Sequence, residues 1–414
     1  MAVTGAVMFL SATANFNAQA APTRYAGGDI SLLPTYEEAG AQYKTHDGEP
    51  IPDLLAYLHD SGLNAMRVRL FVNPDDYTGS DKDANACQDL DYILPLCKQI
   101  VDHGFKLMLD FHYSDTWADP AKQWTPKSWE GLSDEELYVK IYDYTKSTLE
   151  TLKGEGIVPD MIQTGNEISY GMLWGPYGTK NPKKCYMNSD ANWARLIKLL
   201  EEAGKACREV CPDALIVLHN ERITQPNALF DFYKRLAVVD YDVIGLSYYP
   251  YFHGTLANLN TVLDGLATRQ PDKQVMIVET GYPYKWEVPG SNFDHTATWP
   301  YSDAGQAKFT QELVDDLLNH PQVTGLFWWW MEYNAYKTSL SGWYNAPLFD
   351  STTGKATAAL KALCSFADGS GIDGVYTDME TEADQAVYSI WGIRVNDITK
   401  PGMYIRGGRK ILVR

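Results

Sequence analysis

The chain has 414 residues, enough for one large barrel-sized domain with an appendage or for two medium-sized domains. Asp and Glu outnumber Lys and Arg by 53 to 35, and the resulting formal charge of −18 argues against nucleic acid or an anionic membrane surface as a partner. Aromatic residues form 13% of the chain, with 27 Tyr and 12 Trp, which suits either a large core or a surface for flat, partly apolar ligands such as sugars.

The first 21 residues have the composition of a secretory leader. A short apolar run is followed by small residues and by Ala18-Gln19-Ala20, although the basic segment that usually comes first is missing. No other apolar run is long enough to span a membrane. We therefore predict a leader over 1–21 and expect a protein that is secreted or at the cell surface of a bacterium, with the periplasm as the alternative location.

Residues 22–366 alternate between apolar segments that predict strands and amphipathic segments that predict helices. The predicted strands are Tyr25–Ile30, Ala65–Phe71, Lys106–Tyr113, Met161–Thr164, Leu215–Glu221, Val243–Pro250, Gln274–Thr280 and Gly325–Met331. The predicted helices are Leu54–Ser61, Leu90–His103, Asp134–Lys153, Trp193–Val210, Asn227–Leu236, Thr261–Thr268, Asp303–Asn319 and Lys355–Phe366. Eight such units predict a parallel (β/α)8 TIM barrel, with a doubly wound open sheet as the alternative.

Residues 367–414 differ in composition from the barrel segment. Gly369–Gly374 is typical of a linker, and three short strands are predicted at Tyr388–Arg394, Gly402–Arg406 and Lys410–Val413. This β-rich tail is too small to be stable alone. It resembles the C-terminal sorting tails of secreted bacterial enzymes, and an ordinary β-extension packed on the barrel is the equal alternative.

Two predicted strands end in a glutamate. Met161–Thr164 leads into Gly165-Asn166-Glu167, and Gln274–Thr280 carries Glu279 near its end. A lone Asn-Glu is more often a turn or helix N-terminal carboxylate, but the recurrence favours two carboxylates that face one pocket, because the strand ends of a barrel converge on one mouth. Hydrolysis of a glycosidic bond needs such a pair, one to protonate the leaving oxygen and one across the sugar.

Other polar residues at or near strand ends fit this chemistry. We expect Arg67 or Arg69 to hold Glu279 ionised, apolar walls to raise the pKa of Glu167, and Asn166 to bind a sugar hydroxyl. His112 and Tyr248 are expected to support the nucleophile, and Asp29 lies at the end of the first strand. For each residue the alternative is a structural hydrogen bond.

Tryptophans are the candidates for stacking on sugar faces, with core packing as the alternative. They are Trp117, Trp174, Trp343 and one of Trp328, Trp329 and Trp330. Alternation along the last strand predicts that Trp328 and Trp330 face one way and Trp329 the other.

These stretches together resemble glycoside hydrolase family 53, the endo-β-1,4-galactanases, over roughly residues 24–366. The matching stretches are GGDISLLPTYEEAG, MRVRLFVNP, LMLDFHYSDTWADPAKQ, PDMIQTGNEISYGMLW, YDVIGLSYYPYFHGTL, VMIVETGYPY and NAPLFDSTTGKA. The resemblance implies a clan A (β/α)8 barrel and a retaining mechanism, with Glu167 as acid/base and Glu279 as nucleophile. It implies substrate-binding or support positions at Asn166, Arg67, His112, Asp115, Trp117, Tyr248 and Trp343, and the full expected set also contains Asp29, Arg69, His253 and Trp330.

Members of that family include proteins with structural Ca²⁺ in the loop after the nucleophile strand. Here residues 285–300 contain Asn292, Asp294 and His295 without the usual density of acidic residues, so we expect no metal and no cofactor, with a structural Ca²⁺ as the less favoured alternative. Phe252 stands where the family often has Trp, and the last strand reads FWWWMEYN rather than the commoner Trp-Glu-Pro pattern.

The resemblance implies a secreted endo-β-1,4-galactanase that acts as a monomer on the polysaccharide of pectic type I arabinogalactan. A second enzyme hypothesis is another clan A endo-glycanase, such as a β-mannanase or a xylanase. A third hypothesis, from another class, is a non-catalytic glycan-binding protein on a barrel scaffold. The presence of both glutamates argues against the third.

Overall fold

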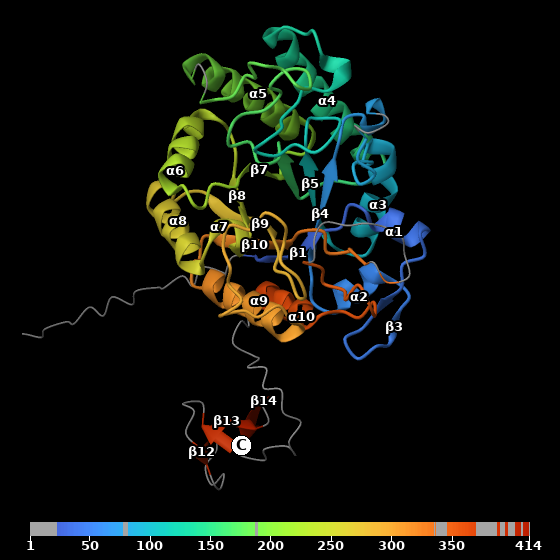
Figure 1. Ribbon diagram of the computed structural model, residues 1–414, viewed down its shortest axis with the longest axis vertical. Helices are drawn as coiled ribbons and strands as arrows, with labels where there is room; N and C mark the ends of the chain where they lie inside the picture. The colour runs from blue at the N-terminus through green and yellow to red at the C-terminus, as the bar shows by residue number, and fades with distance from the viewer. Residues whose placement is uncertain are drawn as a thin grey trace, which may run out of the picture.

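Eight parallel strands close into a barrel in the order β1-β10-β9-β8-β7-β6-β5-β4 (Figure 1). This computed structural model describes residues 23–77, 82–186, 189–334, 336 and 346–369, and the backbone of strands between 387 and 413. The barrel strands are β1 (Tyr25–Asp29), β4 (Ala65–Leu70), β5 (Lys106–Phe111), β6 (Met161–Thr164), β7 (Leu215–Asn220), β8 (Val243–Tyr248), β9 (Gln274–Thr280) and β10 (Val323–Trp328). Because β1 pairs with both β4 and β10, the predicted TIM barrel is confirmed and the open sheet is excluded.

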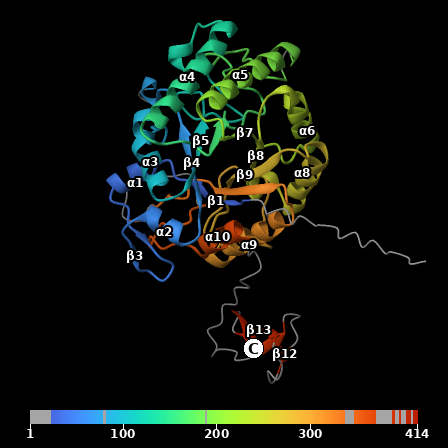
Figure 2. The same ribbon diagram turned by 180° about the vertical axis from the view of Figure 1, so that it is seen from behind.

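Helices surround the barrel on its outer side in both views (Figures 1 and 2). They are α1 (Leu33–Glu38), α2 (Leu54–Asp60), α3 (Leu90–Asp102), α4 (Asp134–Gly154), α5 (Ser189–Val210), α6 (Pro226–Arg235), α7 (Pro250–His253), α8 (Leu256–Arg269), α9 (Asp303–Leu318) and α10 (Ala358–Asp368), with short 3₁₀ turns at Pro74–Asp76, Lys127–Trp129 and Leu236–Val238. All eight predicted helices are present, and the largest difference is α8, which begins five residues before the predicted Thr261. Within the described part of the chain, no helix is both long and apolar enough to cross a membrane.

Local sequence signals explain where the elements begin. At α4, Ser133 accepts a hydrogen bond from the backbone of Glu136, whose carboxylate in turn accepts from the backbone of Ser133, so the helix starts with a capping box. At the end of β6, Gly165 adopts φ +104°, and a Cβ there would lie 2.6 Å from Ile168. That glycine lets the chain turn sharply into Asn166 and Glu167.

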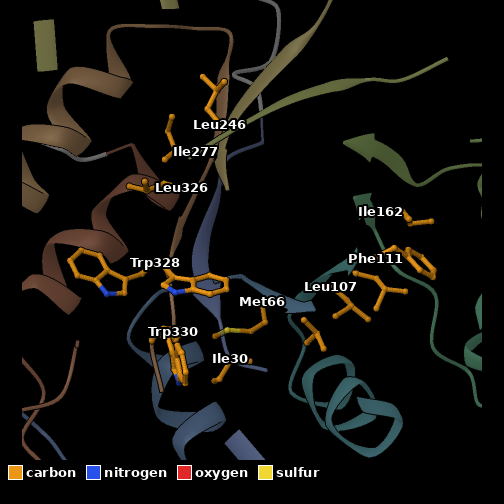
Figure 3. Packing of buried hydrophobic residues seen from close by; sticks show 14 of the residues in the cluster. Ile30, Met66, Leu107, Phe111, Ile162, Leu246, Ile277, Leu326, Trp328 and Trp330 are labelled. Atoms are coloured by element: carbon orange, nitrogen blue, oxygen red, sulfur yellow. The ribbon is translucent and has the colours of Figure 1, made fainter. Parts of the chain in front are cut away.

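Side-chain alternation divides the barrel strands between two environments. Outward residues pack under the helices, among them Leu246, Ile277 and Leu326 on the neighbouring strands β8, β9 and β10 (Figure 3). A separate cluster at the base of the barrel contains Ala65, Met108, Met161, Val217, Val243, Met276, Val278 and Phe327. Two residues further along several of these strands, the same inward face becomes polar. The change from apolar to polar places the charged groups at the carboxyl ends of the strands.

The tail forms a four-stranded antiparallel sheet of its own, in the order β12-β11-β13-β14. Its strands are β11 (Val387–Ser389), β12 (Arg394–Val395), β13 (Gly402–Arg406) and β14 (Arg409–Val413). Near the start of the barrel segment, β2 (Tyr43–Lys44) pairs with β3 (Pro50–Ile51) in a separate two-stranded ribbon. The predicted single strand over Tyr388–Arg394 is wrong, because β11 and β12 are two strands paired antiparallel. The domain boundaries at 22, 366 and 367 and the sorting role stay predictions, and the leader over 1–21 and Trp343 lie outside the described residues.

Candidate active site

A cavity of about 600 Å³ opens at the carboxyl-terminal ends of the barrel strands. Both predicted catalytic glutamates line it, Glu167 after β6 and Glu279 on β9. Its other lining residues are Asp83, Asn85, Trp117, Ala118, Asp119, Pro120, Lys122, Asn166, Glu221, Tyr249, Phe252, His253, Trp329 and Trp330. Six of the predicted site residues therefore line one cavity, namely Glu167, Asn166, Glu279, Trp117, His253 and Trp330, and their roles stay predictions.

Glu279 is buried between a cation and a hydroxyl. Its Oε1 lies 3.0 Å from Arg67 Nη1, and its Oε2 accepts a hydrogen bond of 3.0 Å from the Tyr249 hydroxyl. A register shift between β8 and β9 brings Glu279 opposite Ser247. Burial raises the pKa of Glu279 to about 7, and the Arg67 guanidinium and the Tyr249 hydroxyl oppose that rise.

Arg67 is the centre of a buried ionic network. Its guanidinium lies 2.8 Å from Asp110 and 3.3 Å from Asp29, and it donates a 2.9 Å hydrogen bond to the Asn166 side-chain oxygen. Arg69 contacts Asp29 at 2.6 Å, and no contact with Glu279 is found within the described residues. Of the two arginines expected to hold Glu279 ionised, Arg67 contacts its carboxylate, whereas Arg69 pairs with Asp29 instead.

Glu167 faces the same cavity from a different environment. Its backbone has φ +46°, a conformation that costs a non-glycine residue of the order of 1–3 kcal/mol and that concentrates at functional sites. Its Oε1 accepts a 2.7 Å hydrogen bond from Ser247, and no cation pairs with it among the described side chains. Burial, together with the charges of Glu279 and Glu221, raises the pKa of Glu167 well above its ordinary value. Glu167 therefore keeps its proton more readily than Glu279, which has Arg67 beside it.

An aromatic wall closes one side of the cavity. The ring centroid of Trp117 lies 6.1 Å from those of Trp329 and Trp330, and the Arg69 guanidinium lies 4.8–5.3 Å from all three rings. The expected alternation holds for Trp328 and Trp329 but is wrong for Trp330. The strand ends at Trp328, and Trp330 has φ +54°, so the chain turns and both later rings line the cavity.

Comparison with known proteins agrees with this geometry. The model of glycosyl hydrolase family 53 matches residues 25–363. The chain belongs to glycosyl hydrolase family 53. It is 33% identical over 316 residues to a Bacillus subtilis protein named endo-beta-1,4-galactanase, covering 73% of this chain and 68% of that one. The GH53 catalytic domain of Ignisphaera aggregans superposes with a TM-score of 0.72 at 31% sequence identity, covering 84% of this chain and 97% of that one. A fungal beta-1,4-galactanase structure superposes with a TM-score of 0.68 at 28% identity, covering 82% of this chain and 99% of that one.

One residue expected from its place at a strand end to support Glu279 is not beside it. Tyr248 points outward from β8, and its hydroxyl donates to the Gly254 carbonyl at 2.9 Å. The prediction that Tyr248 supports Glu279 is therefore wrong, and Tyr249 takes that place. Alternation explains the difference, because Val243, Ser247 and Tyr249 share the inward face.

Two further family 53 positions act at a distance from the reacting groups. His112 Nε2 lies 3.1 Å from Asp110, which pairs with Arg67, so two residues stand between the imidazole and Glu279, and its supporting role stays a prediction. Asp115 does not line the cavity. It accepts backbone hydrogen bonds from Asn73 at 3.0 Å and from Lys127 at 2.7 Å and so joins the loops after β4 and β5.

Trp174, expected as a stacking candidate, is 1% exposed and lies in the core, so that prediction is wrong. Trp328 is likewise buried, and its indole nitrogen donates to the Ala346 carbonyl at 2.9 Å. His253 lines the cavity while its Nδ1 accepts from the Tyr249 backbone at 3.0 Å. Asn166 also lines the cavity, but its amide nitrogen already donates to the Ala118 carbonyl at 2.8 Å.

Sequence reasoning missed several residues of the site. Inward positions on the strands or directly after them, two, four or six residues beyond an apolar inward residue, are occupied by Gln163, His219, Ser247, Tyr249 and Glu221. His219, for example, contacts Ser247 Oγ at 2.8 Å and Asn166 Oδ1 at 3.0 Å. Strict alternation applied to every predicted strand is the signal that identifies them.

The loop after β9 does not fit a family 53 calcium site within the described residues. The Asp294 carboxylate accepts from the backbone of Thr296 at 2.8 Å, and His295 Nε2 lies 3.0 Å from the Pro250 carbonyl. No group of three or more His, Cys, Asp or Glu side chains in the described part of the chain is arranged to hold a metal ion. These groups make local hydrogen bonds instead of converging on a cation.

Proposed function

We propose that this protein is a retaining endo-β-1,4-galactanase that cleaves internal bonds of pectic galactan, the backbone of type I arabinogalactan. The observation that carries the proposal is that two glutamates line one cavity in opposite electrostatic surroundings, Glu279 beside Arg67 and Glu167 without a cation among the described residues. The names of the Bacillus and fungal relatives support the substrate. Two carboxylates whose surroundings separate their protonation states are what an acid and a nucleophile require.

In this mechanism the ionised Glu279 attacks the anomeric carbon while Glu167 donates its proton to the leaving oxygen. The Glu279–carbon bond forms as the carbon–oxygen bond breaks, and a glycosyl-enzyme results. Glu167, now ionised, removes a proton from a water molecule, which attacks the same carbon and releases Glu279. Arg67 and Tyr249 orient Glu279 and favour its ionised form before the attack and again when water releases it.

The configuration of azide products assigns the two roles. In Glu167→Ala an activated aryl galactobioside still forms the glycosyl-enzyme, because its leaving group needs no proton, and azide then yields the β-azide. In Glu279→Ala azide occupies the vacated space, attacks from the opposite face and yields the α-azide. NMR of the anomeric proton distinguishes the products. Reversed configurations would exchange the roles, and full activity in both variants would contradict the mechanism.

A panel of polysaccharides tests the substrate and the mode of cleavage. Early loss of viscosity with few new reducing ends on linear β-1,4-galactan is the expected result, because an endo-enzyme cuts within the chain. Faster turnover of β-mannan or xylan would favour the other clan A hypothesis, and binding without turnover of any glycan would favour a carbohydrate-binding protein. Release of a single short product from chain ends would contradict endo cleavage.

We further propose that the protein is secreted and acts as a monomer on its polysaccharide. The composition of residues 1–21 and the size of the substrate, which a cell does not import intact, support secretion. Fractionation of the native host, with detection of the protein in the medium, at the cell surface, in the periplasm or in the cytoplasm, tests the location. Size-exclusion chromatography with light scattering tests the oligomeric state.

A further inference from the structure

A third carboxylate, Glu221, lines the cavity and is not used by the mechanism above. It follows β7 directly and lies two residues after the inward-facing His219, so it faces the same side of the extended chain. Ser169 donates a 2.7 Å hydrogen bond to Glu221 Oε1, and Oε2 is buried with no donor among the described residues. The carboxyl group therefore has acceptor capacity that the described part of this chain leaves unused.

The neighbouring Arg222 forms no ion pair with Glu221 among the described contacts. The Arg222 guanidinium lies over the rings of Tyr170 and Tyr186, at 4.2 and 4.8 Å from their centroids. The Ser169-Tyr170 and Glu221-Arg222 dipeptides are thus joined twice, by the hydrogen bond and by the stack, which fixes the position of Glu221. A fixed carboxylate in a carbohydrate cavity is suited to accept hydrogen bonds from sugar hydroxyls.

The order of strands around the barrel places Glu221 nearer to the strand of Glu167 than to that of Glu279. Glu221 follows β7, next to the β6 strand that leads to the acid Glu167, whereas β8 separates β7 from the Glu279 strand β9. The aromatic wall of Trp117, Trp329 and Trp330 lies over Arg69 of β4, on the opposite side of the barrel from β7. A glycan that crosses the cavity from the aromatic wall past the two catalytic glutamates reaches Glu221 on the side of the leaving group.

We propose that Glu221 is a specificity-determining residue that binds hydroxyls of the first sugar on the leaving-group side of the scissile bond. This inference rests on the proposed glycosidase function. Its charge also lies close enough to Glu167 to disfavour ionisation of the acid. The two effects are separable, because only the first depends on a sugar in the leaving group.

The test compares two substrates with the full-length enzyme. One is a galactan oligosaccharide, whose leaving group is a sugar, and the other is an aryl β-galactobioside, whose leaving group is not. For Glu221→Gln we expect the ratio of kcat/KM for the oligosaccharide to kcat/KM for the aryl substrate to fall about tenfold, the loss typical of one hydrogen bond to a charged group. Ser169→Ala, which removes the anchor, should lower the same ratio by a smaller factor.

Asp213→Asn is the matched control, because Asp213 is an exposed carboxylate at the opposite end of the barrel, and it should keep the wild-type ratio. An unchanged ratio in Glu221→Gln, whether both activities fall together or neither falls, would overturn the inference. If the wild-type enzyme prefers another β-glycan, the substrate proposal fails, and the same ratio measured with oligosaccharides of that glycan still tests Glu221.

Discussion

Arg67 Nη1 lies 3.0 Å from Glu279 Oε1 at the centre of the barrel, and both side chains are almost fully buried. The same guanidinium contacts Asp110 and Asp29, so one planar cation serves three carboxylates and the Asn166 amide at once. Only a guanidinium group, which holds several N–H donors in fixed directions, can do this. The pair thus connects Glu279 to the strands β1, β4 and β5.

Replacement of Arg67 by Lys tests this connection. A lysine keeps the charge but reaches fewer partners, so we expect kcat to fall about 100-fold and the free energy of unfolding to fall by about 1–3 kcal/mol. Initial rates on galactan and denaturant unfolding measure the two effects. The control is Arg235→Lys, which alters an exposed helical pair with Asp231 and should change neither quantity. Wild-type kcat in Arg67→Lys would show that the network does not orient Glu279.

The adjacent Tyr248 and Tyr249 allow a matched comparison, because only the Tyr249 hydroxyl contacts Glu279. Tyr249→Phe removes the hydroxyl that stabilises ionised Glu279, so the pKa of Glu279 rises and the acid limb of the kcat/KM profile moves to higher pH. Tyr248→Phe removes only the bond to Gly254, so the acid limb should stay in place while stability falls by about 1 kcal/mol. pH–rate profiles of both variants decide between the two tyrosines, and a shift in Tyr248→Phe alone would reverse the assignment.

The basic limb of the kcat/KM–pH profile reports the ionisation of Glu167, the proposed acid. Ser247 donates to Glu167 and lowers the pKa of Glu167, so Ser247→Ala should raise that pKa further. Because activity is lost when the acid loses its proton, the basic limb should move to higher pH while the acid limb moves less, although both limbs are properties of the coupled pair. A basic limb displaced to lower pH would mean that Ser247 acts on a different group.

Glu332, which does not line the cavity, makes the stability of the fold depend on pH. It is fully buried, accepts from the Leu32 backbone at 2.6 Å, and burial raises its pKa to about 8. The folded state therefore holds a proton that the unfolded chain has released above its ordinary carboxyl pKa, so stability falls as pH rises from about 4.5 to about 8. Glu332→Gln should flatten this fall.

Urea unfolding of wild type and Glu332→Gln at pH 5 and pH 8 measures the difference. We expect the variant to gain in stability relative to wild type between these values, because glutamine keeps the oxygen that accepts from Leu32 and has no proton to release. Parallel pH dependence of the two proteins would contradict this origin of the effect.

The sequence by itself determined the architecture. Eight apolar strands separated by amphipathic helices predict a parallel sheet covered by helices, and the count of eight favoured a barrel. The pairing of β1 with both β4 and β10 then excluded the open sheet. The same patterns located Glu167 and Glu279, because a carboxylate that ends an apolar strand stands out in the local sequence. The paired Arg67 and Arg69 also follow from alternation on a single strand.

Tertiary structure alone decided which groups meet. Glu279 meets the Tyr249 hydroxyl because a register shift between β8 and β9 turns Glu279 inward, next to Val278, where alternation along β9 predicts an outward residue. Trp330 turns into the cavity because its backbone leaves the strand with positive φ, which no periodicity predicts. Glu221 and Ser169 meet across 52 residues. Such contacts depend on the twist and register of closed strands, which are set by packing of the whole barrel rather than by any local stretch of the chain.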